Sequence, residues 1–306
     1  MATDAMVIVI WPGASSVLQQ INRGIWPASL TKLLGKSRFL ANTKDETSLM
    51  LECFGQPEQQ DSPLAKLRFS DQIALCADLC YLHPDRDCLR LFHQDIDVTI
   101  DEATQLQAAI LPLVETFQGQ WLTSTTKHWG LQLPKLPNLE WFAIEQLEGQ
   151  SINDKLPVGD NQGDWRRLMN EIQMTLFEHP VNQAREANGL LPINAVWFSG
   201  AKPLALESHW ALVSGEHPLL SVLTKQTQTS WQSSIAETAS AVSQGQNLIV
   251  LPAFDIDADW HTQLSKLEAD IFSPLWQQLR RFRLKSLSIK VPRLGQFQLS
   301  RWRSWL

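Results

Sequence analysis

The stretch Met6-Val-Ile-Val-Ile-Trp-Pro-Gly13 decides the fold of this 306-residue chain. A run of apolar residues that ends at a Pro-Gly turn predicts a strand buried on both faces, which is typical of a parallel sheet. Residues 194–198 and 248–251 predict further buried strands, residues 284–291 alternate as a strand does, and stretches with helical spacing separate these segments. This alternation predicts an α/β fold with a mostly parallel central sheet flanked by helices.

Capping signals mark the starts of the predicted helices. Thr99 and Glu102 have the spacing of a capping box, ahead of a helix that reaches about residue 117. Asp164 is placed to cap a long helix that ends before Pro180. Asp259 is placed to cap another, which runs to about residue 282. Helices therefore separate the predicted strands along most of the chain.

The length lies at the upper limit of what one hydrophobic core serves. The chain is 44% apolar and 19% charged, which is the composition of a globular protein and excludes disorder of the whole chain. We expect a single domain over residues 1–306, with a small inserted subdomain at about 60–165. Within that segment, residues 129–163 are rich in Pro and Gly and predict loops and short strands.

Charge is distributed unevenly along the chain. The net charge is −6, but residues 280–306 hold eight Lys or Arg and no acidic residue, which leaves −14 for the rest. Cations mixed with Trp residues, as at this basic end, can contact nucleic acid or acidic lipid. Alternatively, the first of these cations complement the C-terminal dipole of the preceding helix, and the tail docks on the acidic body. We favour the alternative, because an acidic protein is a poor general nucleic-acid binder.

The sequence carries no sign of export or membrane insertion. The first ten residues lack a basic start, and no stretch approaches the roughly 18 apolar residues of a spanning helix. The three clustered cysteines Cys76, Cys80 and Cys88 do not form a secreted disulfide pattern. With His83 they have a loose zinc-like spacing, but buried free thiols are the simpler interpretation. We therefore expect a cytoplasmic protein with no membrane partner.

The most informative motif is His179-Pro-Val-Asn-Gln-Ala-Arg-Glu-Ala-Asn-Gly-Leu-Leu-Pro-Ile-Asn-Ala-Val-Trp-Phe-Ser-Gly200. Asn182, Arg185 and Asn194 form a candidate anion site, because Arg donates two parallel hydrogen bonds and Asn adds neutral donors. In the alternative interpretation, the two Asn side chains satisfy turn backbone and Arg185 pairs with a nearby acidic residue. The residues by themselves leave both interpretations open.

This motif resembles the signature of the archaeal-type, cofactor-independent phosphoglycerate mutases, which are members of the alkaline-phosphatase-like superfamily. Together with Cys76-Ala-Asp-Leu-Cys-Tyr-Leu-His-Pro-Asp-Arg-Asp87, it is most similar to a proteobacterial branch of RpfE-type regulatory proteins. The resemblance covers roughly Pro27 to Val291 and implies an alkaline-phosphatase-like fold, reduced in size. It also implies that Asn182, Arg185 and Asn194 handle a phosphate or carboxylate group.

The metal ligands of the resembled mutases are only partly present. Asp257 and His261 align with a late Asp-x-x-Gly-His element that binds a divalent metal, but Trp260 replaces the Gly. The Asp-Gly pair after the family's first strand is replaced by Trp11-Pro-Gly13, and the family's final Asp-His pair has no counterpart here. Two cations about 3.5–4 Å apart need more ligands than Asp257 and His261. Mn or Zn is therefore expected only if a reduced metal site works.

Three functions are compatible with these observations. We expect the first, a bacterial pseudoenzyme without a cofactor that binds a phosphorylated small molecule or another anion in a regulatory role. The second is a metal-dependent phosphoglycerate mutase or phosphatase, with Ser29 and Ser37 nearest to the position of the nucleophile. The third is an interaction module that docks a protein partner through Trp-rich surfaces and the basic tail. Nucleic acid is not an expected partner.

Overall fold

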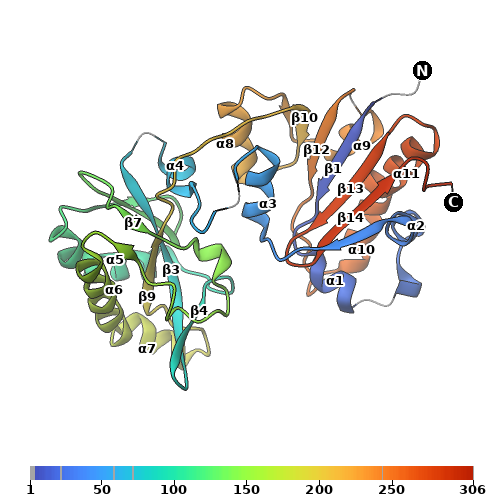
Figure 1. Cartoon of the computed structure of the whole chain (residues 1–306). Helices are drawn as coiled ribbons and strands as arrows, with labels where there is room; N and C mark the ends of the chain where they lie inside the picture. Colours follow the sequence, from blue (N-terminus) through green and yellow to red (C-terminus); the bar gives the residue numbers. More distant parts are fainter. Residues whose placement is uncertain (1–3, 21–22, 58, 71, 243, 306) are drawn as a thin grey trace. The chain divides into compact units, whose positions relative to one another are not determined.

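The computed structural model divides the chain into two compact units. It describes residues 4–305 apart from 21–22, 58, 71 and 243. Unit 1 takes residues up to 58 together with 205–306, and unit 2 takes residues 59–204 (Figure 1). Unit 2 is thus inserted into the chain of unit 1. It extends beyond the expected inserted segment of about 60–165 and includes the 179–200 motif. No helix of the described residues is both long enough and apolar enough to cross a membrane.

Unit 1 is built on a seven-stranded sheet with the strand order β11-β10-β12-β1-β13-β14-β2. The first five strands in this order run parallel, and β14 pairs antiparallel with both of its neighbours. The predicted α/β class with a mostly parallel sheet is thus confirmed. The strands are β1 (Met6–Ile10), β2 (Arg38–Ala41), β10 (Trp210–Ser214), β11 (Trp231–Gln232), β12 (Gln246–Val250), β13 (Ser286–Val291) and β14 (Gly295–Ser300).

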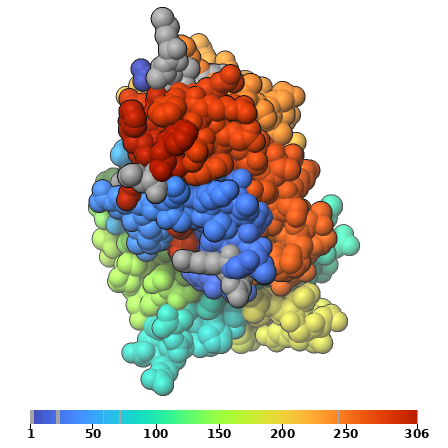
Figure 2. All heavy atoms as spheres, turned by 90° about the vertical axis from the view of Figure 1, so that its right-hand side faces the viewer, coloured from blue at the N-terminus to red at the C-terminus, as the bar shows by residue number. Residues whose placement is uncertain are grey.

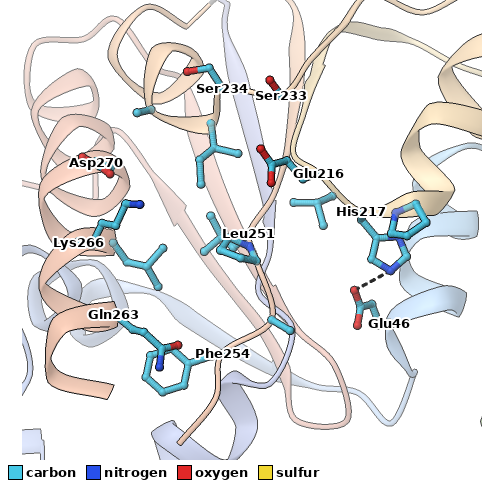
Figure 3. A pocket seen from close by; sticks show the side chains of 17 residues that line it. Glu46, Glu216, His217, Ser233, Ser234, Leu251, Phe254, Gln263, Lys266 and Asp270 are labelled. Carbon is cyan, nitrogen blue, oxygen red and sulfur yellow. Dashed lines mark ion pairs between the residues drawn. The ribbon is translucent and has the colours of Figure 1, made fainter. Parts of the chain in front are cut away.

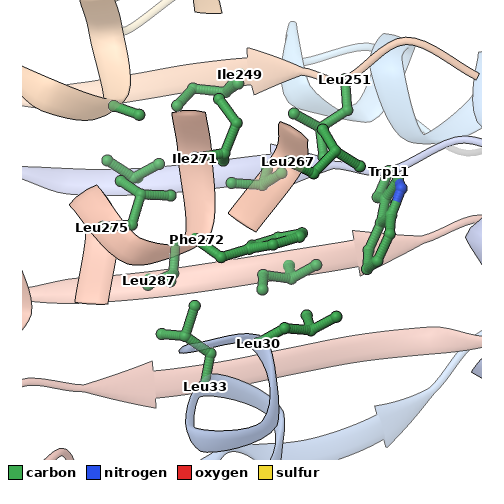
Figure 4. Close-up of a cluster of buried hydrophobic side chains, with 14 of the residues drawn as sticks. Trp11, Leu30, Leu33, Ile249, Leu251, Leu267, Ile271, Phe272, Leu275 and Leu287 are labelled. Atoms are coloured by element: carbon green, nitrogen blue, oxygen red, sulfur yellow. The ribbon is translucent and has the colours of Figure 1, made fainter. Parts of the chain in front are cut away.

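The core of unit 1 lies on one face of this sheet. Val7 and Val9 of β1 point to this face, where they pack with side chains of the covering helices. Figure 4 shows Phe272 near the centre of the cluster, with Leu267 above it and Leu30 below it in this view. The helices of unit 1 are α1 (Ala14–Gln20), α2 (Ala28–Lys36), α3 (Glu46–Cys53), α8 (Pro218–Gln226), α9 (Ile235–Ser240), α10 (Trp260–Leu267) and α11 (Ser273–Arg280), with a 3₁₀ turn at Arg23–Ile25 and a π-helical turn at Glu268–Phe272.

Helix α3 lies on the opposite face of the sheet. Side chains alternate along a strand, so Lys290 of β13 points away from its core-facing neighbours Ile289 and Val291. Its Nζ is 2.9 Å from Oε1 of Glu52 in α3, and the pair holds this helix against the sheet. Lys290 is 6% exposed and belongs to the basic C-terminal segment, so this cation has a structural role.

The C-terminal segment also packs within unit 1. Figure 2 shows the N-terminal helices (blue) and the C-terminal segment (red) side by side on one surface. Nζ of Lys36 at the end of α2 donates to the carbonyl of Ser304 at 3.3 Å. The guanidinium carbon of Arg280 lies 3.8 Å from the ring centroid of Trp305, a cation–π contact.

Unit 2 has its own antiparallel sheet, which the sequence analysis did not predict. The long strand β3 pairs with β4, β6 and β9, and β6 pairs with β5. Two helices, α5 and α6, pack on this sheet around a core with Trp129, Trp141 and Trp165. The elements are α4 (Leu64–Phe69), β3 (Ala74–Asp85), β4 (Cys88–Phe92), α5 (Ile100–Glu115), β5 (Gln120–Thr123), β6 (His128–Gln132), β7 (Leu139–Glu140), a 3₁₀ turn (Ile144–Gln146), β8 (Val158–Gly159), α6 (Gln162–Phe177), α7 (Pro180–Ala187) and β9 (Ala195–Ser199).

Two of the three predicted helix starts are confirmed. The reciprocal capping box of Thr99 and Glu102 begins α5, and the carboxylate of Asp259 accepts from the N–H of Thr262 at the start of α10. The prediction for Asp164 is wrong by one turn. It lies in the first turn of α6, whose N-cap is Asn161 in a left-handed conformation.

Candidate functional site

A cavity of about 780 Å³ opens in unit 1 at the carboxyl ends of β10 and β12 (Figure 3). Its walls come from the segment after β10, the segment after β12, the start of α9, residues of α10 and of the π-helical turn that follows it, and the first residue of α3. In a parallel sheet, all of the strands deliver their following loops to the same edge, which is where ligands bind in open α/β folds. The volume lies within the range of small-molecule sites. This edge is therefore the candidate functional site.

His217 reaches the pocket because it caps a helix. It precedes Pro218, whose ring fits the first position of α8, and its Nδ1 accepts a hydrogen bond from the N–H of Leu219 at 3.2 Å. A ring nitrogen that accepts carries no proton, so the proton of the neutral imidazole is on Nε2. Nε2 lies 3.3 Å from Oε1 of Glu46. His217 thus presents an N–H group to the carboxyl group of Glu46.

The pocket changes the acidity of both partners. Burial, and next the negative charge of Asp45, raise the pKa of Glu46 to about 7. Burial lowers the pKa of His217 below its usual value. At neutral pH, Glu46 is therefore divided between its protonated and its ionised form, while His217 is neutral. A carboxyl group that titrates near pH 7 inside a cavity can accept or release a proton under physiological conditions.

The carboxyl end of β1 is filled by aromatic side chains. Trp11 is fully buried, with its ring 5.1 Å from that of Phe272 and 6.1 Å from that of Phe254 between centroids. Gly13 has a φ of +71°, and a Cβ at this position would overlap the backbone carbonyl of Phe254. The turn after β1 is therefore packed tightly against the segment after β12. An apolar cluster stands where the resembled mutases keep a metal ligand.

The N-terminus of α2 is occupied by a side chain of unit 1. Oε1 of Glu268 accepts from the N–H of Ser29 at 2.8 Å, and Oε2 accepts from the N–H of Leu30 at 3.2 Å. The free N–H groups of a helix start and the helix dipole make such an end an anion site. Here the carboxylate of Glu268 fills that place. Ser29, the residue nearest to the expected nucleophile, is itself 8% exposed.

Asp257 and His261 lie on the surface at the start of α10, and the structure does not combine them in a metal site. The N–H of Asp257 donates to the Asp255 carboxylate at 2.9 Å, within a turn. The ring of His261 stacks on Trp260, with 3.4 Å between centroids and 26° between planes. No group of three or more His, Cys, Asp or Glu side chains among the described residues is placed to hold a metal ion. These residues do not fit the two-metal centre of the resembled family.

Asn182 lies in unit 2, where it is 2% exposed. Its Nδ2 donates to the carbonyls of Leu176 and Ile193 at 2.7 and 2.8 Å, and its Oδ1 accepts from the N–H of Ile193 at 2.7 Å. The amide joins the end of α6 to the segment before β9. All of its polar atoms have backbone partners within the fold.

Arg185 and Asn194 are also buried and bound internally. Arg185 donates to the carbonyls of Asp97 and Leu191 and forms an ion pair of 2.9 Å with Glu102. Asn194 makes a two-way hydrogen bond with the backbone of Leu82, which continues the sheet beyond β9. The three motif residues thus secure the packing of α7 and β9. That they bind an anion stays a prediction.

Sequence reasoning did not single out Glu46 or His217. The one local signal was the dipeptide His217-Pro218, which repeats the His179-Pro180 pair at the start of α7. In both places, the His caps a helix through Nδ1. Only the fold brings Glu46 to the second nitrogen of His217, because α3 and α8 are far apart in sequence.

No family model matches the chain. A stretch of 57 residues is 39% identical to the 2,3-bisphosphoglycerate-independent phosphoglycerate mutase of Methanothrix thermoacetophila, and it covers 19% of this chain and 14% of that enzyme. Among solved structures, a cofactor-independent phosphoglycerate mutase from Thermoplasma acidophilum aligns with a TM-score of 0.37 at 14% identity, covering 98% of this chain and 90% of that one. The PH0037 protein from Pyrococcus horikoshii aligns with a TM-score of 0.47 at 9% identity, covering 98% and 88%. In sequence, the chain is thus similar to a cofactor-independent phosphoglycerate mutase over a short stretch.

Proposed function

We propose that this chain is a phosphoglycerate-mutase-like protein that does not transfer phosphoryl groups and that works by binding a small molecule in the pocket of unit 1. A regulatory role, as in the RpfE-type branch, is part of this proposal. The motif at 179–200 and the short stretch similar to a phosphoglycerate mutase support the family resemblance. The filled positions at the sheet edge support the loss of catalysis.

One observation carries the proposal: the chain's own side chains fill the end of β1, where the resembled mutases keep a metal ligand, and the start of α2, which holds one of the two serines nearest to the expected nucleophile. Trp11 packs on Phe254 and Phe272 at the end of β1. The carboxylate of Glu268 accepts hydrogen bonds from the N–H groups of Ser29 and Leu30. A phosphate group approaching the start of α2 would have to displace this negative charge, which repels it. Both features oppose a metal-bound phosphoryl group at this edge.

The direct test is an assay with 3-phosphoglycerate. Purified full-length protein is incubated with 3-phosphoglycerate in the presence of Mn²⁺, Zn²⁺ or Mg²⁺, and 2-phosphoglycerate and free phosphate are measured. The Methanothrix enzyme is the positive control. We expect neither product above background. Formation of 2-phosphoglycerate that disappears in Asp257→Ala or His261→Ala would instead establish the alternative, a mutase or phosphatase with a reduced metal site.

A second candidate function is favoured by the aromatic surface at the C-terminus. Trp302 and Trp305 are 71% and 51% exposed, and their rings contact Phe282. Exposed Trp next to Arg is typical of protein interfaces. The third hypothesis, an interaction module, uses this surface. Trp302→Ala is the suitable variant, because deletion from Arg301 would remove a side chain that is only 7% exposed. A partner retained by the variant would contradict this function.

A cytoplasmic location is also part of the proposal. The four cysteines Cys53, Cys76, Cys80 and Cys88 are free thiols in the structure. Free thiols in a chain of this length are typical of a reducing compartment. Fractionation of cells that produce the protein, with a periplasmic marker beside it, tests the location.

A further inference from the structure

The charges that line the pocket of unit 1 are mainly negative. The side chains of Glu46, Glu216 and Asp270 line it against one Lys266. His217 adds no charge, because its Nδ1 accepts a backbone hydrogen bond and burial disfavours the imidazolium. Figure 3 shows Lys266 and Asp270 on one wall, with Glu46 and His217 on the opposite wall and Glu216 between them. Among the described residues that line the pocket, the wall with Glu46 therefore has no side-chain cation.

Glu46 has no charged partner among the described residues. Its ion-pair partner among the described residues is His217, which is neutral. The neighbouring Lys44 is directed to Glu52, with 2.7 Å between Nζ and Oε2. The negative charge of Asp45 adds to that of Glu46 and disfavours the ionised form further. A positively charged group that entered the pocket would supply the partner that the fold does not.

The floor between the two walls is apolar. Val250 and Leu251 at the end of β12 and Phe254 in the segment after it line the cavity. Apolar lining accounts for most of the contact of a small ligand, and a few polar groups fix its orientation. The floor suits the hydrocarbon or aromatic part of a ligand. Glu46 lies on the wall at one side of this floor.

We propose that this pocket binds an organic amine, with the apolar body on Leu251 and Phe254 and the protonated nitrogen at the carboxylate of Glu46. Glu216 lines the same cavity and adds to its negative charge. The inference rests on the proposed function, which makes this pocket the ligand site, and it names the ligand class. Phosphoglycerate, which carries several negative charges, is not the preferred occupant, because it would meet three carboxyl groups and one ammonium group.

Three probes of matched shape test the ligand class: 2-phenylethylamine, 2-phenylethanol and 3-phenylpropanoate. Their binding to the full chain is measured by calorimetry at pH 8, with 3-phosphoglycerate as a fourth probe. A charge-assisted hydrogen bond corresponds to about tenfold or more in affinity. We expect the amine to bind at least about tenfold more tightly than the alcohol, and the two anions to bind more weakly than the alcohol.

Two variants locate the site. Glu46→Gln keeps the size of the side chain and removes its charge, so it should reduce the affinity for the amine to about that for the alcohol. Glu115→Gln, at an exposed position in unit 2, is the matched control and should leave the preference unchanged. Unchanged affinity for 2-phenylethanol in Glu46→Gln shows that the pocket remains folded. If Glu46→Gln fails to fold, Glu216→Gln takes its place, with a partial loss expected.

The outcomes separate the inference from the proposed function. No binding of the amine, equal binding of amine and alcohol, or a preference that persists in Glu46→Gln would each overturn the amine site. Tight binding of 3-phosphoglycerate without turnover would also overturn it, while leaving a non-catalytic binding protein in place. Conversion of 3-phosphoglycerate in the metal assay would overturn the proposed function, whatever the amine does.

Discussion

The N–H of Ser29 donates to Oε1 of Glu268 at 2.8 Å, so two residues 239 positions apart close the start of α2. Glu268 lies in the π-helical turn between α10 and α11, and its second oxygen accepts from the next N–H of the helix. The extra residue of a π turn rotates the side chains that follow it, and π turns are frequent at functional sites. In this chain, the turn supplies a carboxylate where an anionic ligand would otherwise bind.

Removal of this carboxylate should destabilise unit 1. We expect Glu268→Ala to lower the free energy of unfolding by about 1–2 kcal/mol, because two helix-start N–H groups lose their acceptor and the dipole loses its counter-charge. Glu268→Gln keeps an acceptor and should cost about half as much. Urea unfolding followed by circular dichroism measures both. Sulfate should stabilise Glu268→Ala more than the wild type; equal stabilisation would show that α2 does not present an anion site.

The raised pKa of Glu46 predicts a pH dependence of stability. Its pKa is about 7 in the folded protein against the ordinary 4.5 of a glutamate side chain, so the folded state holds this proton more tightly. Stability from this group is therefore fully present below about pH 4.5 and is lost as the pH rises to about 7. The loss is at most about 3 kcal/mol, and smaller because the side chain is 31% exposed.

Comparison with Glu46→Gln isolates this effect. The variant does not titrate at position 46, so it should be more stable than the wild type at pH 8 and similar to it at pH 5. The contribution of His217 is present in both proteins and cancels in the difference. Urea unfolding at half-unit steps between pH 5 and pH 8 measures the difference in the free energy of unfolding between the two proteins. A difference that stays constant across this range would contradict the assignment.

The fold class could be predicted from the strands of unit 1, because β1 is an uninterrupted apolar run, as in a covered parallel sheet, and the strand patterns of β12 and β13 alternate along the chain with stretches of helical spacing. The β2 strand and its pairing with β14 could not be predicted, since its four residues Arg38–Ala41 are all exposed and too few to show an alternating pattern. The antiparallel sheet of unit 2 could not be predicted for another reason. β3 is so uniformly buried that its apolar run fits a helix as well as a strand.

The candidate site was predictable only in part. The resemblance directed attention to Trp11 and to Asp257, and the structure shows that the first fills the sheet edge and the second lies outside the pocket. Glu46 begins α3 and His217 caps α8, and only the fold brings these two helix starts together. Neither residue stands in a recognisable motif, so spacing in sequence carries no information about their pairing.

The buried amide of Asn194 should matter for stability. Asn194→Ala leaves the N–H and the carbonyl of Leu82 without their partners, and two buried unsatisfied groups cost roughly 2–4 kcal/mol. Asn188→Ala is the control, because Asn188 is exposed and makes one side-chain hydrogen bond, to the carbonyl of Ala184. Thermal melting compares them. A melting temperature of Asn194→Ala close to that of the control would argue against a structural role and in favour of an anion site.

Substitutions of Trp11 distinguish most directly between a metal site and an apolar core at the end of β1. If β1 still ended in a metal site, Trp11→Asp would restore the acidic residue that the resembled mutases keep there, and Mn²⁺ would stabilise the variant. We expect the reverse. Trp11 is fully buried against Phe254 and Phe272, so Trp11→Ala should cost about 3–5 kcal/mol, and Trp11→Asp more, because it buries an unpaired charge. The matched control is Trp302→Ala, at a Trp that is 71% exposed. The melting temperatures of the three variants are measured with and without Mn²⁺. A melting temperature that rises with Mn²⁺ only in Trp11→Asp would reveal a latent metal site at the edge of the sheet.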